Sequence, residues 1–137
     1  MTELGRSDEL REPDVTERQQ QREYVRAPAS RPVHMTLADR SVSFDTYSID
    51  LSGGGLLLAG PCALSLGERI CFSLTAVEDR PAISGTGSVL RIGPGGECAI
   101  EIEQISDGDR RRLVRFVFEC QRLERRRELA KEERHER

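Results

Sequence analysis

Hydrophobic positions in the central part of the chain follow the two-residue period of β-strands. Val33, Met35 and Leu37 alternate with polar residues. After a turn at Asp39-Arg40 the alternation resumes over residues 42–48, which predicts a β-hairpin. More short strands, separated by turns rich in Gly, Pro or charged residues, are predicted at residues 56–59, 69–76, 82–91 and 97–105. About six short strands at this spacing favour a closed or nearly closed antiparallel β-barrel, because closure removes exposed strand edges.

The period changes to that of a helix after residue 105. Ser106 fits the N-cap position of a helix, with Asp109 three residues later. Apolar residues then recur at helical spacing at Leu113, Phe116 or Val117, Cys120 and Leu123. The sequence therefore predicts a C-terminal helix that packs on the barrel. The almost wholly charged residues that follow predict a solvated helical extension or a disordered tail.

The N-terminal residues show neither period, which predicts a flexible arm that contributes little to the core. The expected architecture is thus mainly β: a six-stranded antiparallel β-barrel with a C-terminal helix and a flexible N-terminal arm. The predicted division is an arm over residues 1–20, a barrel-and-helix domain over residues 21–123 and a charged solvated tail over residues 124–137.

Charge is unevenly distributed along the chain. Charged residues make up 33% of the sequence, hydrophobic ones 36%, and the net charge is −3. Residues 21–109, which contain all the predicted strands, carry twelve acidic side chains against seven basic ones. Binding to DNA or RNA needs clustered Lys and Arg on the folded domain, so this balance argues against a broad nucleic-acid-binding surface. A phosphate-bearing ligand would have to be bound locally.

The cysteines and the longest apolar run bear on the compartment. The chain has four cysteines and no CxxC pair, and most of them lie in or beside apolar runs, where a free thiol packs as a small hydrophobic group. The longest apolar run, Leu56 to Ala59, is far too short to span a bilayer. These features predict a reduced cytoplasmic protein without a membrane span.

Residue patterns typical of enzymes are missing from the sequence. The two histidines are His34, in a predicted strand, and His135, in the charged tail, and neither suggests catalysis. The Cys and His spacings fit no common zinc site, and there is no phosphate-binding loop of the GxxxxGK type. We therefore expect neither an enzyme nor a bound metal or cofactor.

Two short motifs remain as candidates for ligand binding. The first is an RxxxR formed by Arg22 and Arg26, where the arm meets the barrel. The second is the DxSxxG of residues 50–55, in which Asp50 and Ser52 point to one face of a strand. Each has a structural alternative: a solvated linker for the arginines, and for Asp and Ser the satisfaction of turn amides beside glycines with positive φ. One hairpin is enough to bring the arginines over the Asp–Ser face.

Together with the strand series, these motifs resemble the PilZ family, whose cyclic di-GMP receptors carry RxxxR before the barrel and (D/N)xSxxG within it. The resemblance covers roughly residues 18–123. A departure is the segment from Ala99 to Ile102, where family members often show a glycine and end in an aromatic residue.

The resemblance implies a binding site for cyclic di-GMP, with the arm loose without ligand and wrapped over it when bound. Arginine forks suit the phosphates and the O6 and N7 atoms of guanine, while Asp50 can accept from the opposite guanine edge. Ser52 can donate or accept, and glycines let a flat base approach the backbone. The candidate residues are Arg22, Arg26, Asp50, Ser52, Gly53 and Gly55, with Arg91 as a weaker candidate on a barrel strand.

The leading hypothesis is a stand-alone cyclic di-GMP receptor that acts through an unidentified effector protein, as a monomer or a homodimer. The alternative is an adaptor of the same fold that binds proteins without a nucleotide. A small barrel that binds RNA or DNA ranks third, because few aromatic residues are available for base stacking. The regulated process, the partner and the number of nucleotides per site stay open.

Overall fold

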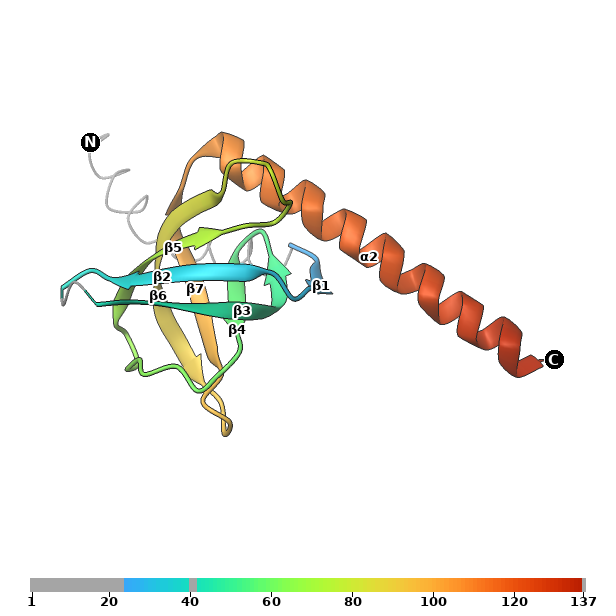
Figure 1. Cartoon of the computed structure of the whole chain (residues 1–137), viewed down its shortest axis with the longest axis horizontal. Coiled ribbons are helices and arrows are strands. Elements are labelled where there is room, and N and C mark those ends of the chain that lie inside the picture. Colours follow the sequence, from blue (N-terminus) through green and yellow to red (C-terminus); the bar gives the residue numbers. More distant parts are fainter. Residues whose placement is uncertain (1–23, 40–41, 137) are drawn as a thin grey trace, which may run out of the picture.

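The computed structural model describes residues 24–39 and 42–136. Within these residues, seven strands precede one long helix (Figure 1). In chain order the elements are β1 (Arg26–Pro28), β2 (Pro32–Leu37), β3 (Ser43–Ser52), β4 (Gly55–Leu58), β5 (Arg69–Leu74), β6 (Ile83–Ile92), β7 (Cys98–Ile105) and α2 (Asp107–Glu136).

The strands form one antiparallel sheet that closes on itself. Their order is β1-β3-β2-β5-β6-β7-β4, and an additional pairing of β3 with β4 closes a six-stranded barrel from β2 to β7. The predicted β-barrel with a C-terminal helix is confirmed. Strand β1 lies beside the second half of β3, where the pairing with β2 has ended. The sequence did not reveal β1, because three residues that include a proline show no period.

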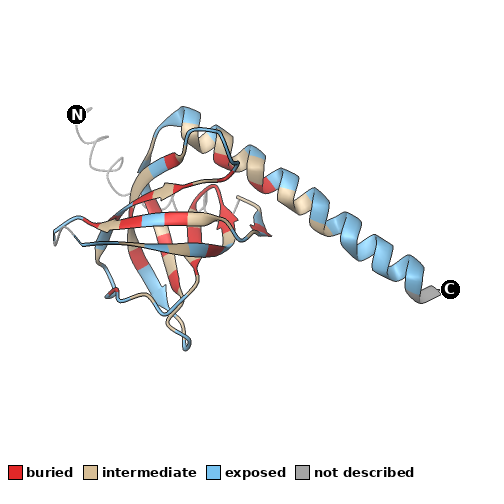
Figure 2. Ribbon diagram, viewed as in Figure 1, coloured by how far each residue is buried: buried red, intermediate tan, exposed pale blue. Residues whose placement is uncertain are grey.

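The interior of the barrel is filled by the alternate residues of its strands. Val33, Met35 and Leu37 are buried, as the two-residue period predicts. Val42 is an exception with 49% exposure, because it lies just before the first paired residue of β3. Figure 2 shows buried positions alternating along the strands. The largest fully buried side chains include Met35, Leu51, Leu58, Ile70, Leu74 and Ile83.

The first half of α2 is held firmly on the barrel. The backbone N–H of Asp109 donates to Oγ of Ser106 over 3.1 Å, which is the predicted N-cap contact. The carboxylate of Asp109 accepts from the backbone N–H of Ser84 and from Arg112 instead of returning to the cap. Leu113 and Val117 are fully buried, and together with the cap they fix where the helix crosses the barrel.

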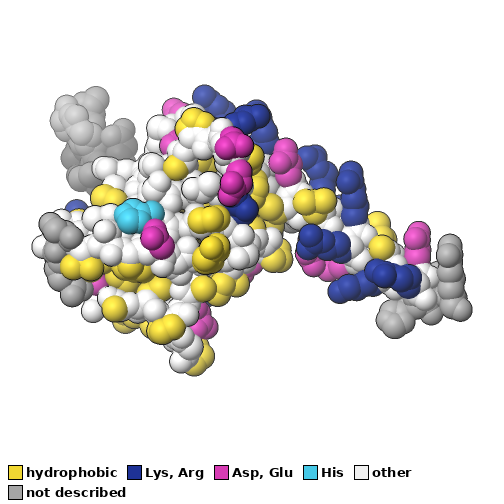
Figure 3. Space-filling model, in the orientation of Figure 1, with side chains coloured by type: hydrophobic (Ala, Val, Ile, Leu, Met, Phe, Trp, Pro, Cys, Tyr) yellow, Lys and Arg dark blue, Asp and Glu magenta, His cyan; other side chains and the backbone are white. Residues whose placement is uncertain are grey.

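The second half of α2 leaves the barrel behind. Leu123, predicted as part of the packed stripe, is 50% exposed. The second half of the helix extends past the barrel and has no strand to pack on (Figure 2). The helix continues to Glu136, which corresponds to the helical-extension alternative (Figures 1 and 2). Lys and Arg side chains line much of its visible surface (Figure 3). No helix in residues 24–39 and 42–136 combines the length and apolarity needed to cross a membrane.

Candidate functional site

Strand register brings the two described motif elements together on the outside of the barrel. Arg26 on β1 pairs with Ser52 on β3, and Ser52 pairs with Gly55 on β4. Gly55 in turn pairs with Glu101 on β7. Directly paired residues point to the same side of a sheet, so this row crosses four neighbouring strands on one face. The second arginine of the RxxxR therefore lies on the same face as the serine of the DxSxxG.

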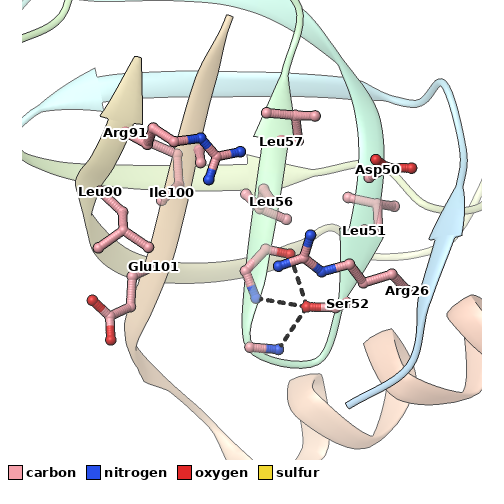
Figure 4. Close-up of a pocket in the computed structure, with 13 residues that line it drawn as sticks. Arg26, Asp50, Leu51, Ser52, Leu56, Leu57, Leu90, Arg91, Ile100 and Glu101 are labelled. Atoms are coloured by element: carbon pink, nitrogen blue, oxygen red, sulfur yellow. Dashed lines mark hydrogen bonds between the residues drawn. The ribbon is translucent and has the colours of Figure 1, made fainter. Parts of the chain in front are cut away.

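A second row runs parallel to the first, two residues further along each strand. It consists of Pro28, Asp50, Leu57, Ala99 and Arg91, which pair in this order across β1, β3, β4, β7 and β6. With strands about 4.8 Å apart, Arg26 and Arg91 start roughly 19 Å from each other along the curved surface. Both long side chains point toward β4, from opposite sides (Figure 4).

The two rows enclose a shallow pocket with a volume of ≈ 70 Å³. Pockets that enclose a small ligand are several times larger, so a dinucleotide would have to lie across this depression with much of its surface outside it. The pocket is lined by Arg26, Asp50, Leu51, Ser52, Gly54, Gly55, Leu56, Leu57, Leu90, Arg91, Ala99, Ile100 and Glu101.

Ser52 is held by the turn that follows it. Its side chain is buried, and Oγ accepts from the backbone N–H groups of Gly54 and Gly55 over 3.2 and 3.1 Å. These are the turn amides of the structural alternative considered for the motif. Ser52 therefore shapes the β3–β4 turn at the rim of the pocket, whatever else it contacts.

The glycines of the turn are required by close approach. Neither Gly53 nor Gly55 has positive φ. A Cβ on Gly55 would lie 2.5 Å from the carbonyl oxygen of Ile100, so its absence lets β4 pair with β7. Gly53 is predicted to face a ligand base, but it is buried outside the pocket lining, against Tyr24 and Val114. Gly54 lines the pocket in its place.

Arg91 reaches the pocket through an irregularity of β6. The register between β6 and β7 shifts between Val89 and Arg91, which is the signature of a β-bulge. Val89 is buried, and the next two residues, Leu90 and Arg91, both face outward and line the pocket. The weakest of the sequence-derived candidates thus lies beside Ala99, opposite Arg26.

The side chains of Asp50, Arg26 and Arg91 form no hydrogen bond or ion pair with another residue in the described part of the chain. Asp50 is half-buried beside a second register shift, between Ser48 and Asp50 of β3. Arg22, the first arginine of the RxxxR, lies outside the described residues. Groups of three or more potential metal ligands do not occur in residues 24–39 and 42–136.

Sequence reasoning missed several residues of the pocket. Leu57, Ala99 and Glu101 face outward in phase with Gly55 along their strands, and the two-residue period carries that information. Their position beside Asp50 and Arg26 depends on strand pairing, which is not visible in the period. Leu90 is exposed because of the bulge, which no local pattern indicates.

Comparison with known proteins supports one fold. The model of a family described as the PilZ domain matches residues 20–119. Among solved structures, the inhibitor of motility MotI/DgrA from Bacillus subtilis aligns at 22% identity with a TM-score of 0.61, over 72% of this chain and 50% of that chain. The PilZ domain of CeSA from a cellulose-synthesizing bacterium aligns at 24% identity with a TM-score of 0.55, over 71% and 98%.

A structure of YcgR from Escherichia coli in complex with c-di-GMP aligns at 20% identity with a TM-score of 0.63, over 79% of this chain and 49% of that chain. The chain thus spans about half the length of MotI/DgrA and YcgR. No curated protein matches it significantly in sequence. The family match extends from just before β1 into α2, over well more than half of the residues. The chain belongs to the PilZ domain family.

Proposed function

We propose that this protein is a non-enzymatic receptor for cyclic di-GMP that binds the dinucleotide in the pocket between β1 and β6. The observation that supports the proposal is that Arg26, Arg91, Asp50 and Ser52 line one pocket, with the two arginines on opposite sides of β4. These residues come from distant parts of the sequence, and the barrel register assembles them.

The two arginines suit the most distinctive groups of the ligand. Cyclic di-GMP carries two phosphates and two guanines, and a guanidinium can form paired hydrogen bonds with a phosphate or with O6 and N7 of guanine. Arg26 is exposed on the short strand β1, and Arg91 is exposed on the opposite wall. Arg22, the first arginine of the RxxxR motif, would add a third cation to the site.

The floor of the pocket suits a flat base. Leu57 of β4 contributes an apolar side chain, and Gly55, two residues earlier on the same face, leaves the area beside it free of a side chain. Asp50 lies at the edge of this floor, where an ionised carboxylate can accept from the N–H groups on the Watson–Crick edge of guanine. A guanine would thus be recognised on one edge by Asp50 and on the other by arginine.

Two of the solved structures support this choice of ligand. They are the PilZ domain of YcgR with c-di-GMP and the larger YcgR in complex with c-di-GMP, and both share the fold of this chain. We further propose that binding orders the arginine segment over the barrel and so changes a surface seen by an effector protein. Such a receptor would act in the cytoplasm.

The test is isothermal titration of the purified chain with cyclic di-GMP, alongside GTP and cyclic di-AMP. We expect saturable binding of cyclic di-GMP alone, lost or strongly weakened in Arg26→Ala and Asp50→Ala, and the titration also gives the number of nucleotides per site. If the chain binds nothing at high ligand concentration while remaining folded, the receptor proposal fails. The protein-binding adaptor then becomes the better hypothesis.

A further inference from the structure

Tyr24 lies midway between the two arginines of the RxxxR and faces away from the pocket. Only one residue separates it from Arg26, which lines the pocket, yet Tyr24 borders a groove along α2. The short segment entering β1 therefore contacts the pocket with one side chain and the helix with another. Strand β1 and α2 lie in contact over this segment.

The ring of Tyr24 fits against a glycine of the second motif. A Cβ on Gly53 would lie 2.6 and 2.8 Å from Cδ1 and Cε1 of Tyr24, and 2.8 Å from Cγ2 of Val114. Since Gly53 does not have positive φ, its backbone alone does not call for glycine. The missing side chain is explained by this three-way packing between the segment entering β1, the β3–β4 turn and α2.

Arg110 in the first turns of α2 completes the contact. Its Nη1 donates a hydrogen bond to the hydroxyl of Tyr24 over 2.8 Å, and its guanidinium carbon lies 5.5 Å from the centre of the ring. A hydrogen bond and a cation near an aromatic ring both favour one position of the side chain. Tyr24 is thereby tied to the part of the helix that is seated on the barrel.

We propose that Tyr24 is a positioning residue that couples cyclic di-GMP binding in the pocket to the seating of α2. The inference rests on the function proposed above and adds how ligand binding in the pocket would affect α2. Ligand that holds Arg26 in place also holds Tyr24 against Gly53 and Arg110, because only Val25 separates the two side chains. By linkage, a firm contact between Tyr24 and α2 favours ligand binding to the same degree.

The coupling has a surface on which it can act. Tyr24 borders a groove of ≈ 630 Å³ along α2 that combines four arginines with apolar side chains. Its lining is Tyr24, Asp107, Arg110, Arg111, Val114, Arg115, Phe118 and Arg122. Moving Tyr24 changes the end of this groove, so ligand binding on one side of β1 alters the shape and charge of a surface on the other side.

The test measures hydrogen exchange of the α2 amides from residue 110 to residue 120, with and without saturating cyclic di-GMP. Wild type is compared with Tyr24→Ala, Tyr24→Phe and Arg110→Ala, all in the full chain. The matched control is Tyr47→Ala, which removes the only other tyrosine, 56% exposed on β3. Titration gives the dissociation constant of each variant, and circular dichroism verifies its fold.

We expect ligand to slow exchange of these amides in wild type and in Tyr47→Ala. Tyr24→Ala should bind about tenfold more weakly, and at saturation its α2 amides should exchange as in the ligand-free state. Tyr24→Phe keeps the ring and should lose only about threefold in affinity, with most of the slowing retained. Arg110→Ala removes the same contact from the helix side, so it should show the same loss of affinity and of slowed exchange as Tyr24→Ala.

Two results would overturn the coupling alone. One is equal ligand-dependent slowing in wild type and in either Tyr24→Ala or Arg110→Ala, which would leave Tyr24 a purely structural role. The other is saturable binding to wild type without any change in α2, which leaves the receptor function intact and removes only the coupling. Absence of binding to wild type removes the receptor function itself and the coupling with it.

Discussion

The turn from Ser52 to Gly55 and the two arginines, Arg26 and Arg91, line the same pocket but differ in how their side chains are held. The hydroxyl of Ser52 is engaged by the turn amides, and Gly55 is pressed against the carbonyl oxygen of Ile100. Arg26 and Arg91 instead extend from β1 and β6 over the pocket, and within the described residues they form no ion pair. The turn is thus determined by the fold, whereas the arginines are available to a ligand.

This difference separates the effects that substitutions should have. A change in the turn should lower the free energy of unfolding and disturb binding only as a consequence. A change of either arginine should weaken binding while leaving stability nearly unchanged. Measuring the free energy of unfolding and the ligand affinity of the same variants therefore tests whether the turn and the arginines have these separate roles.

The largest effect is expected for Gly55→Val. The new side chain would enter the space of the Ile100 carbonyl, and β4 could not keep its pairing with β7, so the free energy of unfolding should fall by about 3 kcal/mol. Urea denaturation measures the change. The control is Gly108→Ala, where no atom lies within 4 Å and the helix should gain up to about 0.5 kcal/mol. An unchanged midpoint for Gly55→Val would show that the turn is not constrained by β7.

The next largest effect is a loss of affinity in Arg26→Ala. Removing a charge-assisted hydrogen bond to phosphate or guanine should weaken cyclic di-GMP binding by about 1.5 to 3 kcal/mol. The free energy of unfolding should change by less than about 0.5 kcal/mol, because the side chain is exposed. Arg26→Lys should recover only part of the affinity, since lysine lacks the planar fork. Titration and urea denaturation of the same samples measure both quantities. A fall in stability that accompanies the loss of affinity would contradict the assignment of Arg26 to ligand binding alone.

A smaller change in stability is expected for Ser52→Ala. The amides of Gly54 and Gly55 lose a shared acceptor in a buried turn, so the free energy of unfolding should fall by about 1 to 2 kcal/mol. Ser52→Thr keeps the hydroxyl and serves as the comparison. If Ser52→Ala left urea denaturation unchanged but abolished the binding of cyclic di-GMP, Ser52 would act, like the arginines, on ligand binding and not on stability.

The buried Cys98 and the exposed Cys71 should differ in chemical reactivity. Burial, together with the nearby Cys62 and Glu97, raises the pKa of Cys98 to about 11. A raised pKa lowers the thiolate fraction, to roughly 0.1% at pH 8, and the thiolate is the reactive form. Cys71 is exposed on the outer face of β5. Iodoacetamide at pH 8 followed by mass spectrometry should label Cys71 first and Cys98 last, and labelling of Cys98 should accelerate as the pH approaches 11.

The sequence predicted the elements that have a clear period and missed those determined by contacts between strands. The alternation at Val33, Met35 and Leu37 and the cap at Ser106 predicted β2 and the start of α2 correctly. The bulge that directs Arg91 outward leaves no local signal, because it is a property of the pairing with β7. The packing of Gly53 against Tyr24 and Val114 is likewise invisible to the motif, because both neighbours are distant in sequence. The predicted ligand contacts and the boundaries of the arm and tail stay predictions.

The length of α2 makes it a lever arm. Its 30 residues extend about 45 Å, and Arg110 stands near the end that is seated on the barrel. A rotation of only 10° at that seat would swing the far tip by about 7 Å. A shift at the pocket too small to reshape the barrel would thus become a displacement the size of a side chain at the other end of the molecule.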